Sequence, residues 1–312
     1  MKLIAPDYYP DFYCIADRCK HSCCIGWEID IDEETLEKYR LITDDFGDLL
    51  RKEIQLKEDT ACFCLSENER CPFLNKNGLC DIILTLGDDY LSQICTDHPR
   101  FCSFLSDRTE IGLGLCCEAA GKLILEKKEK TSLIILEDDG ACEELNDFEK
   151  LILKKRNHFF EILQNREISV EKRMARLLFE AEISLPNFTF SEWTDIYLSL
   201  ERMNDSWGTL LLNIKNENKK TETFAYNTAF EQLLHYFVYR HLFDACDESE
   251  LAERIGFCVL SVWMIEEICK RCASFTLEKM IEICRLYSSE IEYSSENTQA
   301  LLEIIKNKGV LS

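Results

Sequence analysis

Apolar residues recur at the helical period through most of the second half of the chain. Between residues 229 and 243 they repeat at intervals of three and four, the pattern of one buried helix face. The positions on this face are Phe230, Leu233, Leu234, Phe237, Val238, His241 and Leu242. Residues 251–272 follow the same period. We therefore expect helices from about residue 144 nearly to the end of the chain.

Shorter patterns and polar breaks divide the remainder. Breaks are expected around Pro186 and over residues 213–223. We expect the first part of the chain to consist of loops and short elements. The expected helices are residues 33–42, which Asp30 or Asp32 can cap, 86–95 and 118–128. The expected strands are residues 109–117 and 131–138. The sequence thus predicts a mainly α fold. A cysteine-rich, metal-stabilised domain with short helices and few strands occupies residues 1–130, and an all-α helical domain occupies residues 131–312.

Composition supports a folded, helical protein. Hydrophobic residues make up 46% of the 312 residues and aromatic residues 11%, which is enough for a sizeable core. Only 5 prolines and 11 glycines occur, which favours long helices over a turn-rich sandwich or barrel.

The chain is strongly acidic in both halves, with a formal net charge of −22. This charge excludes a nucleic-acid partner, because such binding relies on clustered Lys and Arg. The negative charge has two alternative roles. It attracts a cationic partner, such as a lysine-bearing surface, or it only keeps the protein soluble.

The N-terminal stretch lacks the apolar region of a signal peptide, and no segment reaches the roughly 18 apolar residues needed to span a bilayer. We therefore expect a cytoplasmic protein with no membrane partner. In that compartment thiols stay reduced, so a cysteine pattern indicates metal binding or catalysis rather than disulfides.

Twelve of the 18 cysteines lie between Cys14 and Cys117. They form three groups: Cys14, Cys19, Cys23 and Cys24; then Cys62, Cys64, Cys71 and Cys80; then Cys95, Cys102, Cys116 and Cys117. Thiolates suit zinc and iron–sulfur clusters. No paired C-x2-C knuckles occur among them, so an ordinary zinc ribbon is disfavoured. The spacing leaves open iron–sulfur or zinc, and one site or two.

The later cysteines follow a different pattern. Cys258, Cys269 and Cys272 share one helical stripe with apolar residues, which predicts core packing, and Cys142, Cys246 and Cys284 are assigned to the core as well. His21 and His98 each lie within three residues of a cysteine and are candidates for a mixed metal site.

Four spaced elements resemble the flagellin lysine N-methylases of flagellated bacteria. They are residues 14–27 (CIADRCKHSCCIGW), 71–80 (CPFLNKNGLC), 91–100 (LSQICTDHPR) and 113–118 (LGLCCE). The same pattern is similar to small cysteine-cluster domains that chelate zinc or iron. The resemblance covers about the first 120 residues, and the helical remainder is similar only in general character.

This resemblance implies an enzyme that transfers methyl groups from S-adenosylmethionine to lysine side chains of flagellin, with a [4Fe-4S] cluster. It implies a helical domain that docks the substrate. The matching metal-ligand candidates are Cys14, Cys19, Cys23, Cys24, Cys71, Cys80, Cys95 and Cys117. Cys62, Cys64, Cys102 and Cys116 lie beyond the family pattern.

Two residues are candidates for binding the cofactor. The ring of Trp27 suits a sulfonium cation or packs the cysteine domain, and Arg100 suits the carboxylate of the cofactor or a structural ion pair. The group that deprotonates the lysine is left unassigned. The alternative functions are a non-catalytic zinc- or iron-binding interaction module and a redox sensor that uses the vicinal cysteine pairs.

Overall fold

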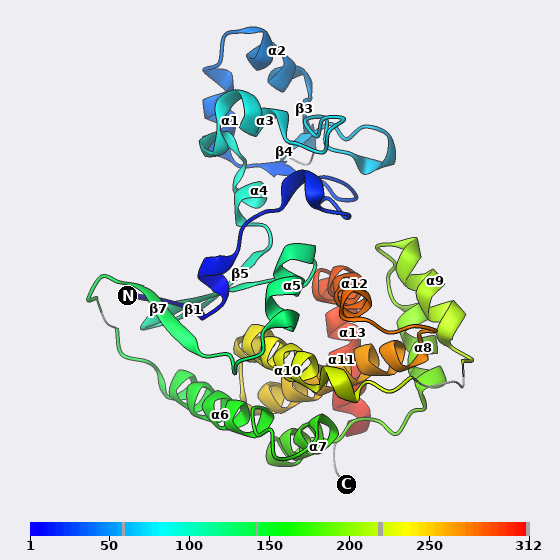
Figure 1. Ribbon diagram of the computed structural model, residues 1–312. Coiled ribbons are helices and arrows are strands. Elements are labelled where there is room, and N and C mark those ends of the chain that lie inside the picture. Colours follow the sequence, from blue (N-terminus) through cyan, green and yellow to red (C-terminus); the bar gives the residue numbers. More distant parts are fainter. Residues whose placement is uncertain (58–59, 142, 218–220, 310–312) are drawn as a thin grey trace. The chain divides into compact units, whose positions relative to one another are not determined.

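The computed structural model describes residues 1–312 except 58–59, 142, 218–220 and 310–312 (Figure 1). The chain folds into two compact units. Unit 1 comprises Met1–Phe12 and Phe101–Ser312, and unit 2 comprises Tyr13–Arg100. Unit 2 is therefore an insertion in the chain of unit 1. The domain boundary near residue 130 stays a prediction, and residues 101–130 cluster with the helical unit.

Unit 1 contains a four-stranded sheet in the order β5-β6-β1-β7. The strands are β1 (Lys2–Pro6), β5 (Arg100–Leu105), β6 (Arg108–Leu113) and β7 (Leu133–Asp138). Strand β1 pairs in parallel with β6 and antiparallel with β7. The strands predicted near residues 109 and 131 are present as β6 and β7, whereas β1 was not predicted from the sequence.

The rest of unit 1 is helical, as predicted from about residue 144 onward. Its helices are α5 (Glu118–Glu126), α6 (Asp147–Leu163), α7 (Val170–Glu180), α8 (Phe190–Ser199), α9 (Asp205–Ile214), α10 (Asn227–His241), α11 (Glu248–Arg271), α12 (Leu277–Tyr287) and α13 (Ser295–Gly309). Short 3-10 turns are η1 (Tyr9–Asp11), η5 (Phe224–Tyr226) and η6 (Leu242–Asp244), and a π-helical turn, η7, spans Ser288–Glu292. Helices α10 and α11 lie side by side in the core (Figure 1).

The predicted buried face of α10 is confirmed, because all seven of its residues are buried. The stripe on α11 is confirmed as well: Cys258, Cys269 and Cys272 are buried, as is Cys284 on α12. The prediction for Cys246 was wrong, since it is exposed just before the cap of α11. Cys142 lies outside the described residues.

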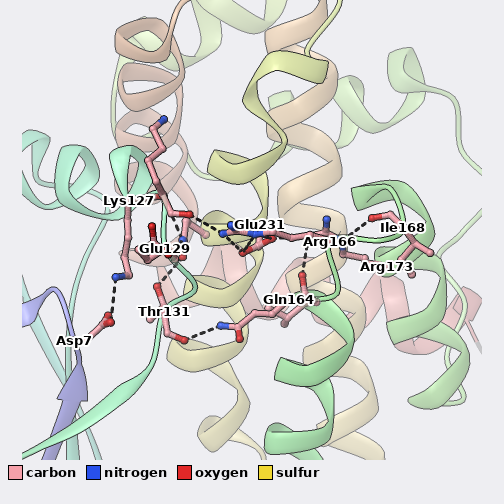
Figure 2. Close-up of polar contacts among 12 residues, drawn as sticks. Asp7, Lys127, Glu129, Thr131, Gln164, Arg166, Ile168, Arg173 and Glu231 are labelled. Carbon is pink, nitrogen blue, oxygen red and sulfur yellow. Dashed lines mark hydrogen bonds and ion pairs between the residues drawn. The ribbon is translucent and has the colours of Figure 1, made fainter.

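Buried ion pairs join the elements of unit 1. Glu110 of β6 accepts two hydrogen bonds from the guanidinium of Arg156 on α6, and both side chains are almost fully buried. Glu231 of α10 pairs with Arg166 at 2.9 Å and with Arg173 of α7 at 2.8 Å (Figure 2). Each pair links two elements that are distant in sequence.

Unit 2 is built from short elements. They are β2 (Asp30–Ile31), β3 (Ile54–Lys57), β4 (Thr60–Phe63), α1 (Glu33–Arg40), α2 (Asp45–Lys52), α3 (Asp81–Leu86), α4 (Gln93–Asp97), η2 (Ala16–Arg18), η3 (Glu67–Glu69) and η4 (Asp88–Tyr90). The strands form a small sheet in the order β2-β4-β3. Its main cluster of buried residues is small and consists of Ile29, Ile31, Tyr39, Leu50, Ala61, Phe63, Cys71, Phe73, Leu74 and Ile82.

The single helix predicted at residues 86–95 was wrong in extent. It is divided into η4 and α4, with a break after Tyr90. The carbonyl of Tyr90 accepts a hydrogen bond from the hydroxyl of Tyr39 at 2.7 Å, so it has a tertiary partner in place of a helical one. The predicted cap of α1 is confirmed as Asp32, whose carboxylate accepts from the amide of Thr35.

The described part of the chain contains no helix with the length and apolarity required to span a membrane.

Candidate metal centre

Four cysteines of unit 2 lie at the edge of its apolar core. They are Cys24, Cys71, Cys80 and Cys95. Cys71 is buried within the core, and the other three are partly buried against it. They come from four separate segments of the chain, so only the folded unit brings them together.

Backbone pairing places Cys24 beside Cys71. The amide of Cys71 donates to the carbonyl of Cys24 at 2.8 Å, and the amide of Gly26 donates to the carbonyl of Glu69 at 3.0 Å. The φ angle of Gly26 is +93°, a conformation that other residues adopt only with strain. The turn after the vicinal cysteines therefore uses the one residue type that fits it.

A hydrogen-bonded turn holds Cys71 and Cys80 in register. The side-chain oxygen of Asn75 accepts from two backbone amides of the turn at 2.9 and 3.1 Å, and its nitrogen donates to Asp81 at 2.8 Å. The guanidinium of Arg70 donates to two carbonyls of the same turn at 2.9 and 2.6 Å. Asn and Gly commonly stabilise such turns through local hydrogen bonds.

Cys95 is positioned by α4, which is anchored to α1. The backbone amide of Gln93 donates to the carboxylate of Asp32 at 2.8 Å, the same carboxylate that caps α1. Because these bonds lower the pKa of Asp32, it stays ionised at neutral pH. One aspartate thus fixes the start of two helices.

The four thiols influence one another electrostatically. Burial raises the pKa of Cys71 to about 12 and of Cys95 to about 11, and it raises the pKa of Cys80 as well. A negative charge on one thiolate raises the pKa of the other thiols further. This electrostatic interaction occurs between every pair of the four thiols. Cys24 differs, because a hydrogen bond with Cys23 lowers its pKa to about 7.

Polar groups that favour the thiolate form surround the cluster. They are the backbone amide of Phe73 for Cys71, the backbone amides of Ile82 and Ile83 for Cys80, and the Ser22 hydroxyl and the Arg70 charge for Cys24. Hydrogen bonds to coordinating sulfurs orient ligands and tune metal centres.

The donor set fits a soft metal ion or an iron–sulfur cluster. Thiolates are the preferred ligands of both, and a bound cation removes the repulsion that raises the thiol pKa values. Among the described residues, no three His, Cys, Asp or Glu side chains are already arranged to hold a metal ion. Binding would therefore require the four thiols to turn toward the ion.

Three of the other predicted ligands precede Cys24 on the same segment of unit 2, and one of them, Cys23, is hydrogen-bonded to Cys24. Cys14 and Cys23 are exposed, and Cys19 is half-buried on the same segment, where its thiol donates to the carbonyl of His21 at 3.2 Å. Cys117 belongs to unit 1 and is the cap residue of α5. Of the eight predicted ligands, the structure groups four at the edge of one core.

The cysteines beyond the family pattern also separate. Cys62 is buried on β4, and Cys64 follows that strand half-buried. Cys102 and Cys116 belong to unit 1. Burial raises the pKa of Cys116 to about 12.

Both cofactor candidates lie near His98. The indole of Trp27 donates to the carbonyl of Cys23, and its ring lies 5.7 Å from the His98 ring at an angle of 44°. Burial, with a smaller effect of Arg100, lowers the pKa of His98 to about 4, so its imidazole is neutral at pH 7. Arg100 donates to the carbonyl of Thr96 at 2.9 Å, which fixes part of its side chain.

Sequence reasoning missed Arg70 and Asn75. The dipeptide Asn77-Gly78 is a turn signal from which a tight loop between Cys71 and Cys80 could have been predicted, although our sequence analysis did not use it. The role of Arg70 had no sequence signal, because its carbonyl partners exist only once that turn has formed.

Fold and site together define a mainly α-helical protein with a thiol cluster in an inserted unit. Residues 189–312 match the family model described as FliB lysine N-methylase C-terminal domain. This match falls in the helical part, where the sequence elements gave only a general likeness.

The chain is also similar to curated proteins. It is 30% identical over 142 residues to proteins named lysine-N-methylase from Salmonella choleraesuis and Salmonella typhimurium, covering 41% of this chain and 33% of each relative. It is 30% identical over 142 residues to the flagellar biosynthetic protein FliU of Salmonella muenchen, covering 79% of that protein. No solved structure matches.

The chain therefore belongs to the FliB lysine N-methylase family, as its cysteine elements predicted. Its aligned part spans about a third of the length of the two lysine-N-methylases.

Proposed function

We propose that this chain is a protein lysine N-methyltransferase that transfers methyl groups from S-adenosylmethionine to lysine side chains of flagellin in the cytoplasm. The observation that carries the proposal is the similarity to proteins named lysine-N-methylase. The flagellar name of a third relative supports flagellin as the substrate. The net charge of −22 favours encounter with a lysine-bearing surface.

The chemistry requires a neutral lysine amine. Its lone pair attacks the methyl carbon as the carbon–sulfur bond breaks, so the sulfonium becomes a neutral thioether and the amine nitrogen gains the methyl group. The ammonium proton must leave beforehand, to a basic side chain or to water. Desolvation of the ammonium lowers its pKa and so assists that loss.

In this proposal unit 2 carries a [4Fe-4S] cluster, with zinc as the alternative. The cluster supplies a soft, thiolate-held cationic centre when bound. Trp27 offers an aromatic face for the sulfonium, next to a neutral His98 that does not repel it. The planar guanidinium of Arg100 matches the geometry of the cofactor carboxylate.

The test uses protein purified without oxygen and analysed for iron, sulfide and zinc. It is then incubated with flagellin and methyl-labelled S-adenosylmethionine. We expect label on flagellin lysines, and loss of at least tenfold in rate for Trp27→Ala with partial retention in Trp27→Phe. Wild-type protein that carries its metal and transfers no label would contradict the proposal.

A second candidate is a non-catalytic metal-binding interaction module. It is favoured by the position of the thiols at the edge of a small core, where a metal serves folding rather than chemistry. Calorimetry separates the two: a metal-loaded chain without affinity for S-adenosylmethionine supports the module.

A further inference from the structure

Strand β7 is an edge of the sheet in unit 1, and only β1 pairs with it (Figure 1). Residues 133–136 of this strand are Leu-Ile-Ile-Leu, a run without proline or charge. The side chain of Ile135 is 56% exposed. An apolar edge strand binds a further strand unless proline, charge or another segment protects it. The edge of β7 therefore has the properties of a docking site.

The pairing with β1 identifies the backbone groups that point away from the sheet. The amide of Asp7 donates to the carbonyl of Ser132 at 2.9 Å, so Ser132 faces β1. Hydrogen-bonding positions alternate along an antiparallel pair, so Ile134 faces β1 as well, and the N–H and C=O groups of Leu133 and Ile135 point outward. Within the described residues, no hydrogen bond reaches these outward groups.

This open edge is closed at both of its ends. At Thr131, the preceding outward position, the carbonyl accepts a hydrogen bond from the side chain of Gln164 at 2.7 Å (Figure 2). After Ile135 the register with β1 shifts at Leu136, and such a bulge interrupts regular pairing. The open edge therefore extends over residues 133–135 and fits one short extended segment.

Charges beside the open edge favour a cationic segment. Glu137 and Asp138 follow it directly, and both are exposed. Neither forms an ion pair with a described residue, although Lys2 is opposite Asp138 in the register. Lys130 is exposed before the other end of the edge, so a lysine of the bound segment is favoured at the Glu137 end. A second copy of this chain carries a net charge of −22 itself and is repelled.

We propose that the open edge of β7 binds an extended, lysine-bearing segment of a partner protein, which pairs with Leu133 and Ile135 and places its lysine near Glu137 and Asp138. The backbone of the segment supplies the partners of the outward groups, and an apolar side chain covers Ile135. The link to methylation rests on the proposed function, in which the segment belongs to the substrate. Docking itself is measured without a methyl donor, so either proposal can fail alone.

The first experiment titrates the full chain with short synthetic peptides. The first peptide alternates valine and threonine and ends in two lysines. The second has glutamates in place of the lysines, and the third is the first with N-methylated backbone amides. We expect the first to slow hydrogen exchange across residues 131–138, and the other two to bind at least tenfold more weakly. Equal binding of the third peptide would overturn strand addition, and equal binding of the second would overturn the choice of a cationic segment.

The second experiment changes the edge and keeps the first peptide. Ile135→Pro removes an outward N–H, which edge strands tolerate, and Ile135→Lys adds a repelling charge. Each is expected to weaken binding at least tenfold, and urea unfolding checks that each remains folded. Asp138→Lys is expected to weaken binding about threefold. Its matched control, Glu303→Lys on the exposed side of α13, changes the net charge equally and should bind as wild type does. Equal weakening in both would overturn the site.

The third experiment tests the competing occupant, a second copy of this chain. Sedimentation velocity compares the wild type with Ile135→Lys in the absence of peptide. We expect the same assembly state for both proteins. A wild-type dimer that dissociates in Ile135→Lys would show that a second copy occupies the edge, and it would overturn the proposal.

Discussion

The two units of this chain are stabilised by different means. Unit 1 contains helices of up to 24 residues, and a continuous core buries the faces of α10 and α11. Unit 2 contains no helix longer than 8 residues among its described elements, and its core ends at four thiols. Hydrophobic burial accounts for the fold of unit 1, whereas unit 2 combines a small core with helix caps and hydrogen-bonded turns.

The comparison also concerns buried charge. In unit 1, acidic side chains such as Glu110, Glu231 and Glu292 are buried against arginines. In unit 2 the buried and partly buried groups that could ionise together are the four thiols. A bound metal ion would neutralise the negative charge of their thiolates. Changes in unit 1 should therefore act independently of metal, and changes near the thiols should act through it.

The largest expected effect is in unit 1, at Arg156. Arg156→Met leaves Glu110 buried without its partner, which should lower the free energy of unfolding by about 3–5 kcal/mol. The double variant Glu110→Leu/Arg156→Met should recover most of that loss. Urea unfolding measures both, and bound metal should not change. A parallel fall in metal content would show that metal binding by unit 2 depends on the stability of unit 1.

A pH effect of similar size is expected at Glu292. Burial raises its pKa, but Arg240 and His241 outweigh burial and hold it at about 2. Its contribution to stability is present above the unfolded value near 4.5 and is lost as the pH falls toward 2. The shift corresponds to about 3 kcal/mol. Between pH 5 and pH 3, urea unfolding should show a smaller loss for Glu292→Gln than for wild type, and equal losses would contradict the pairing.

In unit 2, Asn75→Ala should weaken metal binding about 10- to 100-fold, because the turn that holds Cys71 and Cys80 loses three hydrogen bonds. Competition with a coloured chelator measures this affinity. Lys52→Ala, at the exposed end of α2 in the same unit, is the control and should bind metal as wild type does. Unchanged affinity in Asn75→Ala would show that the turn does not organise the site.

The smallest expected effect is at Asp32. Asp32→Ala removes the cap of α1 and the acceptor for Gln93 of α4, at a cost of about 1 kcal/mol. Hydrogen exchange should show faster opening of α1 and α4 and no change in α11. If α11 also opens faster, stability is shared across the whole chain and the comparison fails.

The sequence predicted the features that follow from local periodicity. The buried face of α10, the stripe on α11 and the cap at Asp32 each depend on residues within a few turns of one another. It also identified the segments that carry the thiol cluster. Two predictions were wrong: the burial of Cys246 and the continuous helix over residues 86–95. Both features depend on tertiary contacts rather than on the local sequence pattern.

Spacing could not predict which of the eight candidate cysteines contact the core of unit 2. Cys24 approaches Cys71 through a backbone pairing that joins segments more than forty residues apart in sequence. Arg70 and Asn75 act on carbonyls and amides, which carry no sequence signature. Strand β1 was missed for a related reason, since its partners Arg108 and Asp138 lie over a hundred residues away.

The position of β1 bears on how the chain folds during synthesis. β1 precedes unit 2 in the chain, yet it pairs with β6 and β7, which follow unit 2. At roughly 5–20 residues per second, the ribosome takes on the order of 5–20 s to reach β6 after β1 has emerged. The whole of unit 2 is translated within that interval. Unit 2 can therefore begin to fold before the strands that pair with β1 have been synthesised.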